Sequence, residues 1–240
     1  MSEGLSDTAR AVRTEFPRSV RVIENAWIPL SDGCRLAARI WLPDDAEEDP
    51  VPALLEYIPY RKGDWTAVGD SVRHAYLAGH GYASIRVDMR GSGDSEGVMR
   101  GKYLRQEQDD AVEVLRWMSE QPWSTGACGM FGISWGGYSA LQVAARRPPE
   151  LKAIISICAS DDRYADDVTY IGGAVLALHA ISWGSMMLAF NARPPDPYVV
   201  GAAWRDTWFQ RMETSPRFVE DALSHPHRDS FWRQGSVCED

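Results

Sequence analysis

A serine framed by glycines is the residue of this chain best suited to chemistry. In GMFGISWGGYSALQVAARRP, residues 129–148, Ser134 is the central residue of a G-x-S-x-G pattern. An apolar run precedes the pattern and a helix-like segment follows it. This context predicts a sharp turn between strand and helix, where small neighbours avoid clashes and helix N–H groups face a developing negative charge. We therefore interpret Ser134 as a nucleophile, with a glycine-rich packing turn as the weaker alternative.

A tyrosine at the end of another apolar run could assist such a serine. Tyr60 lies in YIPYRK, residues 57–62, at the end of a predicted strand. A tyrosine hydroxyl can donate a hydrogen bond to an oxyanion. Simple packing of Tyr60 at a strand end is the competing interpretation, because tyrosine is often half-buried.

The segment DMRGSGDSEG, residues 88–97, is a glycine-rich loop after a predicted strand. We expect Asp88 and Arg90 to form an ion pair that holds this loop near the face that carries Ser134. Its role would be architectural rather than chemical.

Strand-like and helix-like segments alternate along the first two thirds of the chain. Two β-prone runs around SDGC predict an antiparallel hairpin, and the later short apolar runs alternate with helical segments, which predicts a mostly parallel sheet covered on both faces. The predicted strands are residues 20–30, 35–43, 51–60, 82–91, 127–133 and 151–160, and the predicted helices lie within residues 64–80, 106–122 and 134–147.

Beyond residue 160 we expect a helical cap without further strands. The stretch at residues 171–190 has no Asp, Glu, Lys or Arg and is long enough to span a membrane, but its basic flanks are weak, so we expect a cap helix. We divide the chain into an N-terminal extension (1–19), a core (20–160) and a cap (161–240) whose aromatic residues shape an acyl pocket.

Bulk properties narrow the class of protein. The 34 acidic and 25 basic residues give a net charge of −9, which argues against nucleic-acid binding. The four cysteines fit no metal-ligand spacing, and three lie in apolar segments, which predicts core thiols in a reducing, cytoplasmic compartment. No signal peptide is evident, and we expect no metal or cofactor.

The order of these motifs resembles one known family. The hairpin, IPYRK, DMRGSGDSEG, GMFGISWGG and SICASDDRY are similar to the cocaine esterase-like, or X-prolyl dipeptidyl peptidase, family of α/β hydrolases. The resemblance runs from about residue 20 to the end. It implies an α/β-hydrolase fold with an inserted helical cap, Ser134 as nucleophile, and an oxyanion hole made by the Tyr60 hydroxyl and the Trp135 backbone N–H. Many relatives have tyrosine where Trp135 stands, and a backbone donor is indifferent to that change.

The partners of the serine are missing from the matching region. A catalytic serine needs a base and an orienting carboxylate, and in α/β hydrolases both follow it in the chain. The resemblance places them beyond the cap, so we expect a fragment that lacks the C-terminal core strands, the Asp and the His. Of the later histidines, we expect His179 to be a satisfied core residue and His225 and His227 to lie in a solvated loop.

The acidic segment DDRYADD, residues 161–167, gives the one hint about substrate. Asp161 and Asp162 follow a strand on the same sheet edge as Ser134 and could bind the α-ammonium of an aminoacyl ester or a peptide. Some members of the resembled family recognise an amine in this way. A solvated acidic loop is the alternative.

The sequence as a whole predicts a serine hydrolase of esters or amides that forms an acyl-enzyme on a small ester or peptide substrate. Two alternatives stay open: a truncated, non-catalytic product that binds ligands, and an acyltransferase or haloperoxidase on the same scaffold. The incomplete sheet edge also predicts association, including a homo-oligomer.

Overall fold

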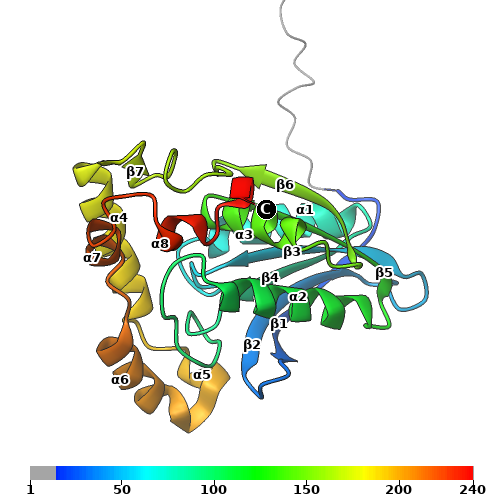
Figure 1. Cartoon of the computed structure of the whole chain (residues 1–240). Coiled ribbons are helices and arrows are strands. Elements are labelled where there is room, and N and C mark those ends of the chain that lie inside the picture. Colours follow the sequence, from blue (N-terminus) through cyan, green and yellow to red (C-terminus); the bar gives the residue numbers. More distant parts are fainter. Residues whose placement is uncertain (1–14, 240) are drawn as a thin grey trace, which may run out of the picture.

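The computed structural model describes residues 15–239, and a mixed sheet of six strands forms its centre (Figure 1). The strand order in the sheet is β1-β2-β4-β3-β5-β6. The pairs β1–β2 and β2–β4 are antiparallel, and the remaining pairs are parallel. The strands are β1 (Val20–Pro29), β2 (Arg35–Pro43), β3 (Val51–Ile58), β4 (Ala83–Asp88), β5 (Ser124–Ile133) and β6 (Leu151–Ile157). The predicted parallel sheet with an antiparallel N-terminal hairpin is confirmed. Of the predicted N-terminal extension, residues 1–14 lie outside the described part.

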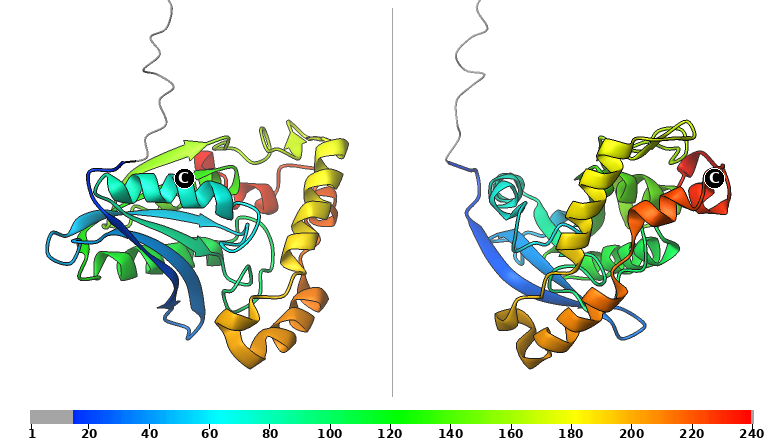
Figure 2. Two further views of the ribbon diagram at one scale, coloured as in Figure 1. Left: turned by 180° about the vertical axis from the view of Figure 1, so that it is seen from behind. Right: turned by 90° about the vertical axis from the view of Figure 1, so that its left-hand side faces the viewer.

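Helices cover the two faces of this sheet unequally. Helix α1 (Ala67–Gly79) lies on one face, and α2 (Arg105–Ser119) and α3 (Trp135–Ala145) lie on the other (Figure 2). Helix α2 shows why the sequence folds this way, because its buried apolar residues recur at helical spacing and face the core. These residues are Ala111, Val114, Leu115 and Met118.

The cap differs from the prediction at its beginning. Residues 171–190 do not form one helix, because the positive φ angles of Gly172 (56°) and Gly173 (86°) make a turn between two short strands. Helices occupy most of the rest, as predicted, and no helix among residues 15–239 is long and apolar enough to cross a membrane. The elements are β7 (Tyr170–Ile171), β8 (Ala174–Val175), α4 (Ala177–Asn191), α5 (Pro197–Val200), η2 (Gly201–Ala203), α6 (Trp204–Thr214), α7 (Phe218–Leu223), α8 (Ser230–Arg233) and η3 (Val237–Glu239).

The prediction of three core cysteines is wrong. Only Cys128 is buried, whereas Cys34 is half-buried and Cys158 and Cys238 are exposed. Cys158 follows the apolar strand β6 directly, but β6 is the edge of the sheet, so an apolar neighbourhood in sequence does not bury it.

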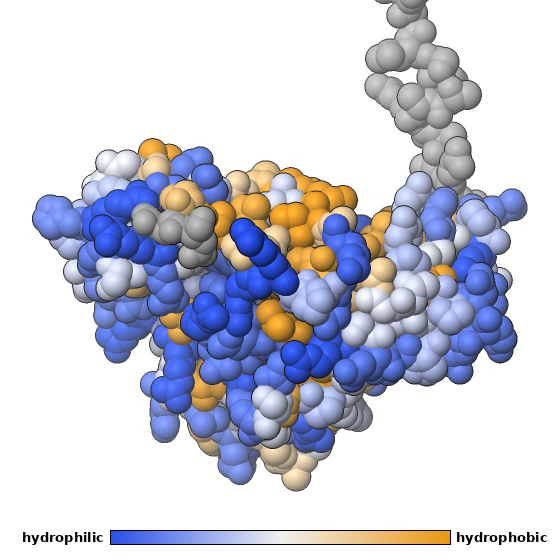
Figure 3. All heavy atoms as spheres, turned by 45° about the vertical axis from the view of Figure 1, so that its right-hand side comes forward, coloured by the Kyte–Doolittle hydropathy of each residue, from blue (hydrophilic) through white to orange (hydrophobic). Residues whose placement is uncertain are grey.

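Within residues 15–239, no helix covers one face of the sheet at β5 and β6. Helix α1 packs mainly on β1, β2 and β4, so the apolar side chains of Ile133, Ile155 and Ile157 stay 42–62% exposed. Hydrophobic residues gather along the upper edge of the molecule in Figure 3, where Figure 1 places β6. Parallel strands are normally covered on both faces, so this face is suited to association.

Candidate active site

Ser134 occupies a strained turn between β5 and α3. Its backbone angles are φ 58° and ψ −118°, a region that residues other than glycine rarely adopt. The Ser134 N–H donates to the Ile157 carbonyl at 2.8 Å, and the Ser134 carbonyl accepts from the Tyr138 N–H at 3.0 Å, which begins α3. This is the geometry of a nucleophile elbow, and it leaves the serine partly exposed.

The two glycines that flank Ser134 are required because neighbouring atoms leave no room for a Cβ at either position. A Cβ on Gly132 would lie 2.6 Å from the backbone of Gly136. A Cβ on Gly136 would lie 2.7 Å from Cγ2 of Ile58 in β3. The G-x-S-x-G pattern therefore lets the elbow fold onto itself and onto the neighbouring strand.

Tyr60 lies beside Ser134, where an oxyanion donor is needed. Its hydroxyl interacts with the Ser134 side chain and with the Trp135 backbone N–H, and it also meets the Trp183 side chain from α4. Burial raises the pKa of this hydroxyl, and those hydrogen bonds offset only part of the rise. Tyr60 therefore remains protonated, and its hydroxyl lies within reach of both the Ser134 side chain and the Trp135 N–H.

The loop that carries Tyr60 is held by the neighbouring strand β4 and the loop after it. Arg86 Nη1 donates to the Ile58 carbonyl at 3.2 Å, and Ser92 Oγ donates to the Pro59 carbonyl at 2.7 Å. Asp88 Oδ1 accepts from the Lys62 N–H at 2.6 Å. The glycine-rich segment thus fixes the residues on both sides of Tyr60.

The predicted ion pair between Asp88 and Arg90 is not formed. Asp88 is fully buried under the loop, where backbone N–H groups are its nearest donors. Arg90 points toward α2 instead and pairs with Asp110 at 2.7 Å and Asp32 at 2.8 Å.

Trp135 ties the elbow to the rest of the molecule through its side chain. The indole is fully buried, and its Nε1 donates to Glu107 Oε2 at 2.9 Å. Its ring centroid lies 5.2 Å from that of Tyr103 and 5.8 Å from that of Phe218 in α7. Sequence reasoning missed Glu107, because nothing local links a residue in the first turn of α2 to an indole in α3.

Glu107 should make stability fall as pH rises. Burial raises its pKa from the usual 4.5 to about 7, against opposing hydrogen bonds from Trp135 and the Leu104 N–H. The folded state therefore binds the extra proton, so its stabilisation is complete below about 4.5 and is lost as pH rises to about 7. Between pH 4.5 and 8, the free energy of unfolding measured in urea should therefore fall by about 1–3 kcal/mol less in Glu107→Gln than in the wild type. The exposed Glu120→Gln in the same segment should keep the wild-type slope, and an unchanged slope in Glu107→Gln would contradict the assignment.

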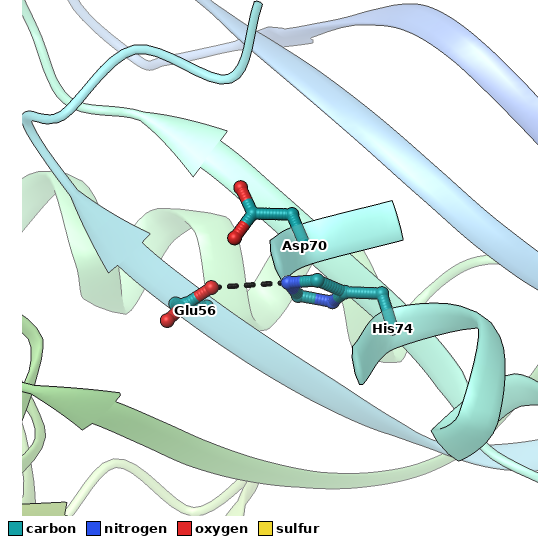
Figure 4. Close-up of side chains that lie close together, drawn as sticks. All are labelled: Glu56, Asp70 and His74. Atoms are coloured by element: carbon teal, nitrogen blue, oxygen red, sulfur yellow. Dashed lines mark hydrogen bonds and ion pairs between the residues drawn. The ribbon is translucent and has the colours of Figure 1, made fainter. Parts of the chain in front are cut away.

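Ser134 and Tyr60 line a cleft, and two residues of a buried charge cluster, Glu56 and Asp70, line it as well. This cluster resembles a metal site, but arginines already balance its negative charge. Glu56, Asp70 and His74 bring three ligand atoms within 4.8 Å of one another (Figure 4). Arg86 Nε lies 3.2 Å from Asp70, and Arg73 Nη2 lies 2.8 Å from Asp70 and 3.0 Å from Glu56. Two guanidinium groups thus balance two carboxylates, and this set does not fit a divalent cation.

None of the described histidines is hydrogen-bonded to Ser134. His74 is fully buried between Ser84 Oγ (2.7 Å) and Glu56 (3.0 Å).

His179 was predicted to be a core residue, but it is exposed on α4, because few side chains of this helix are buried. It lines a cavity that Ser134 also lines. His225 pairs with Asp229 at 2.6 Å and lines a different cavity.

The two aspartates predicted to bind an amine lie after β6. Asp162 pairs with Arg228 at 2.6 Å and also accepts the N–H of Tyr164 at 2.9 Å, while exposed Asp161 accepts a backbone N–H with its carbonyl. Two other carboxylates of the same segment, Asp166 and Asp167, line a cavity together with Ser134.

The fold defines the class: an α/β hydrolase-like fold, with Ser134 at the sharp turn between β5 and α3. Residues 32–240 match the family described as X-Pro dipeptidyl-peptidase (S15 family), and the chain belongs to this family of serine esterases and peptidases.

Individual relatives agree with this assignment. The cocaine esterase of Rhodococcus sp. (strain MB1 Bresler) is 30% identical over 91% of this chain and 41% of its own length. A CocE/NonD family hydrolase from Staphylococcus aureus shares the fold, with a TM-score of 0.64 and 20% identity over 98% of this chain and 43% of that chain. An α-amino acid ester hydrolase gives a TM-score of 0.62 at 19% identity over 99% of this chain and 43% of that chain. The chain thus spans less than half the length of these relatives.

Proposed function

We propose that Ser134 is the nucleophile of a hydrolase that cleaves esters or amides through an acyl-enzyme. The observation that carries this proposal is the position of the Tyr60 hydroxyl, beside both the Ser134 side chain in its strained turn and the Trp135 N–H. In the first step Ser134 Oγ loses its proton to a base and bonds to the substrate carbonyl carbon. The carbonyl oxygen becomes an oxyanion that accepts from both donors, and the leaving alcohol or amine departs with the proton. Water then releases the acid by the same route.

The base and its carboxylate would come from outside residues 15–239. The uncovered face at β5 and β6 supports this part of the proposal, because Ile133 on that face also lines the cleft that holds Ser134 and Tyr60. A segment that covered Ile155 and Ile157 would therefore reach the nucleophile. Without it we expect this chain to turn over substrate poorly.

An oxyanion hole without a base still accelerates reaction, so the chain can be tested alone. Enzymes that lack a triad member retain about 10³–10⁴-fold catalysis from the hole and from binding. We expect a fluorophosphonate to label Ser134 slowly: Oγ bonds to phosphorus, fluoride leaves, and the proton goes to solvent base. Added imidazole should accelerate labelling by about tenfold or more, a small part of the 10²–10⁴ that a positioned base gives.

Intact mass and peptide mapping would read out this experiment. Wild-type chain should gain one adduct at Ser134, and Ser134→Ala should gain none with or without imidazole. Labelling of other serines at the same rate, or no adduct at Ser134 even with imidazole, would refute the nucleophile assignment and favour a non-catalytic product.

Recognition of an amine by Asp161 and Asp162 is part of the same proposal. A phosphonate that carries a free amine should label faster than its neutral analogue, and Asp161→Asn with Asp162→Asn should remove that preference. If the preference survives there but is lost in Asp166→Asn, the carboxylate that lines the Ser134 cavity is the recognition group instead.

A further inference from the structure

A second cavity lies between the core and the cap, and Ser134 does not line it. Its volume is about 200 Å³, and it is enclosed by the loop before α2, the loop after β6, and helices α4, α7 and α8. Trp183 lines this cavity and also the cleft of Ser134 and Tyr60, so its indole borders both. The apolar walls are Leu104, Val175, Trp183, Phe218, Phe231 and Trp232.

A buried guanidinium lines this cavity without an ion pair. Arg163 is 1% exposed, and its Nη1 donates only to backbone carbonyls, those of Phe231 at 3.0 Å and Gln234 at 2.6 Å. Its Nε has no hydrogen-bond partner among residues 15–239. The rings of Tyr103, Phe231 and Trp232 lie 5.0–5.7 Å from its Cζ. Burial nevertheless lowers the pKa of Arg163, as expected for a charge removed from water.

The neighbouring carboxylate of Asp167 attracts Arg163 electrostatically and offsets only part of the effect of burial. Asp167 Oδ2 accepts a hydrogen bond from Lys102 Nζ at 2.7 Å, and its Oδ1 has no hydrogen-bond partner among the described residues. Three cations (Arg100, Lys102 and Arg163) and two carboxylates (Asp167 and Asp221) line the cavity, and Arg100 is exposed. The buried charges are two cations, Lys102 and Arg163, against one carboxylate, Asp167. This leaves an excess of positive charge among aromatic side chains, where an added anion would reduce the cost of burying Arg163.

We propose that this cavity binds a small carboxylate with an apolar, aromatic body, with the carboxylate at Arg163 and the body among the walls of Trp183, Phe218 and Trp232. The size suits such a ligand, since a cavity of about 150 Å³ holds benzene. A carboxylate matches the planar donor set of a guanidinium. The proposal does not depend on the activity of Ser134, so the chain can be tested as it stands.

Phenylacetate and its neutral analogue phenylacetamide are the probes. Titration calorimetry and quenching of tryptophan fluorescence should show phenylacetate binding about tenfold or more tightly than phenylacetamide, because a charged hydrogen bond to Arg163 distinguishes them. Phenylalanine should bind no better than phenylacetate. Equal binding of acid and amide, or clearly tighter binding of phenylalanine through Asp167, would overturn the assignment.

Variants separate this cavity from the nucleophile cleft. Arg163→Met should abolish the preference for the acid, whereas Arg205→Met, an exposed arginine of α6, should leave it unchanged. Ala222→Leu fills the cavity from α7 and should abolish binding, which keeps the test valid if Arg163→Met does not fold. Ser134→Ala should bind phenylacetate like the wild type. Retained binding in Ala222→Leu, or loss in Ser134→Ala, would place the ligand in the other cleft and refute the proposal.

Discussion

Replacing Tyr60 with phenylalanine is expected to slow the imidazole-assisted phosphonylation of Ser134 by about 10²–10³-fold, the usual effect of removing one oxyanion-hole donor. The Tyr60 hydroxyl meets both the Ser134 side chain and the Trp135 N–H, and burial keeps it protonated by raising its pKa. The tetrahedral phosphonyl oxygen would then keep only the backbone donor. The measurement is the second-order rate constant of adduct formation, followed by intact mass.

The strand that precedes Tyr60 provides a matched control. Tyr57 is 1% exposed in β3, and its hydroxyl has no hydrogen-bond partner among the described residues. Tyr57→Phe removes the same atom three residues before Tyr60 and should leave the rate within about twofold, since an unpaired hydroxyl contributes little. A rate within threefold of wild type for Tyr60→Phe would mean that Tyr60 only packs at the strand end. Equal loss in both variants would point to a general disturbance of β3.

Features that depend on short stretches of chain could be predicted from the sequence. The G-x-S-x-G pattern predicts the turn at Ser134, because only glycines allow the close backbone contact between Gly132 and Gly136, four residues apart. The hairpin around SDGC and the alternation of strands and helices have the same local origin. The place of Tyr60 at a strand end made it a candidate, and the resemblance strengthened it, because Tyr60 and Ser134 follow different strands, β3 and β5.

Features that depend on tertiary neighbours could not be predicted. Arg90 and Asp88 are two residues apart, yet one faces α2 and the other caps the loop, so proximity in sequence gave the wrong ion pair. The apolar run before Cys158 suggested burial, but exposure is decided by the uncovered edge at β6. The indole of Trp135 depends on Glu107, 28 residues earlier, a pairing that no periodicity encodes.

Of the residues in the buried charge cluster, Arg86 is expected to lower the free energy of unfolding most when it is replaced. It is fully buried, donates to Asp70 at 3.2 Å, and approaches Glu56 at 3.8 Å and Asp88 at 4.0 Å. Arg86→Met would leave Asp70 and Glu56 with only the partly exposed Arg73 as a cation, which should lower the free energy of unfolding by about 3–5 kcal/mol in urea at pH 7. Adding Asp70→Asn should recover part of the loss. A cost below about 1 kcal/mol would show that the cluster is balanced without Arg86.

Two measurements distinguish this charge effect from lost packing: the pH dependence of the cost of Arg86→Met, and the cost of replacing the neighbouring Arg73. Burial raises the pKa of Glu56, but the His74 hydrogen bond and the charges of Arg86 and Arg73 outweigh it and hold the pKa below the usual 4.5. The contribution of Glu56 is thus present above about 4.5 and is lost as pH falls through its folded-state pKa, so the cost of Arg86→Met should shrink toward acid pH. Lost packing would give a cost independent of pH.

The neighbouring Arg73 provides a control, because its side chain is 37% exposed. Arg73→Met should lower the free energy of unfolding by about 1 kcal/mol or less. Because Arg86 also holds the Ile58 carbonyl, Arg86→Met should slow labelling of Ser134, which would tie the stability of the cluster to the oxyanion loop.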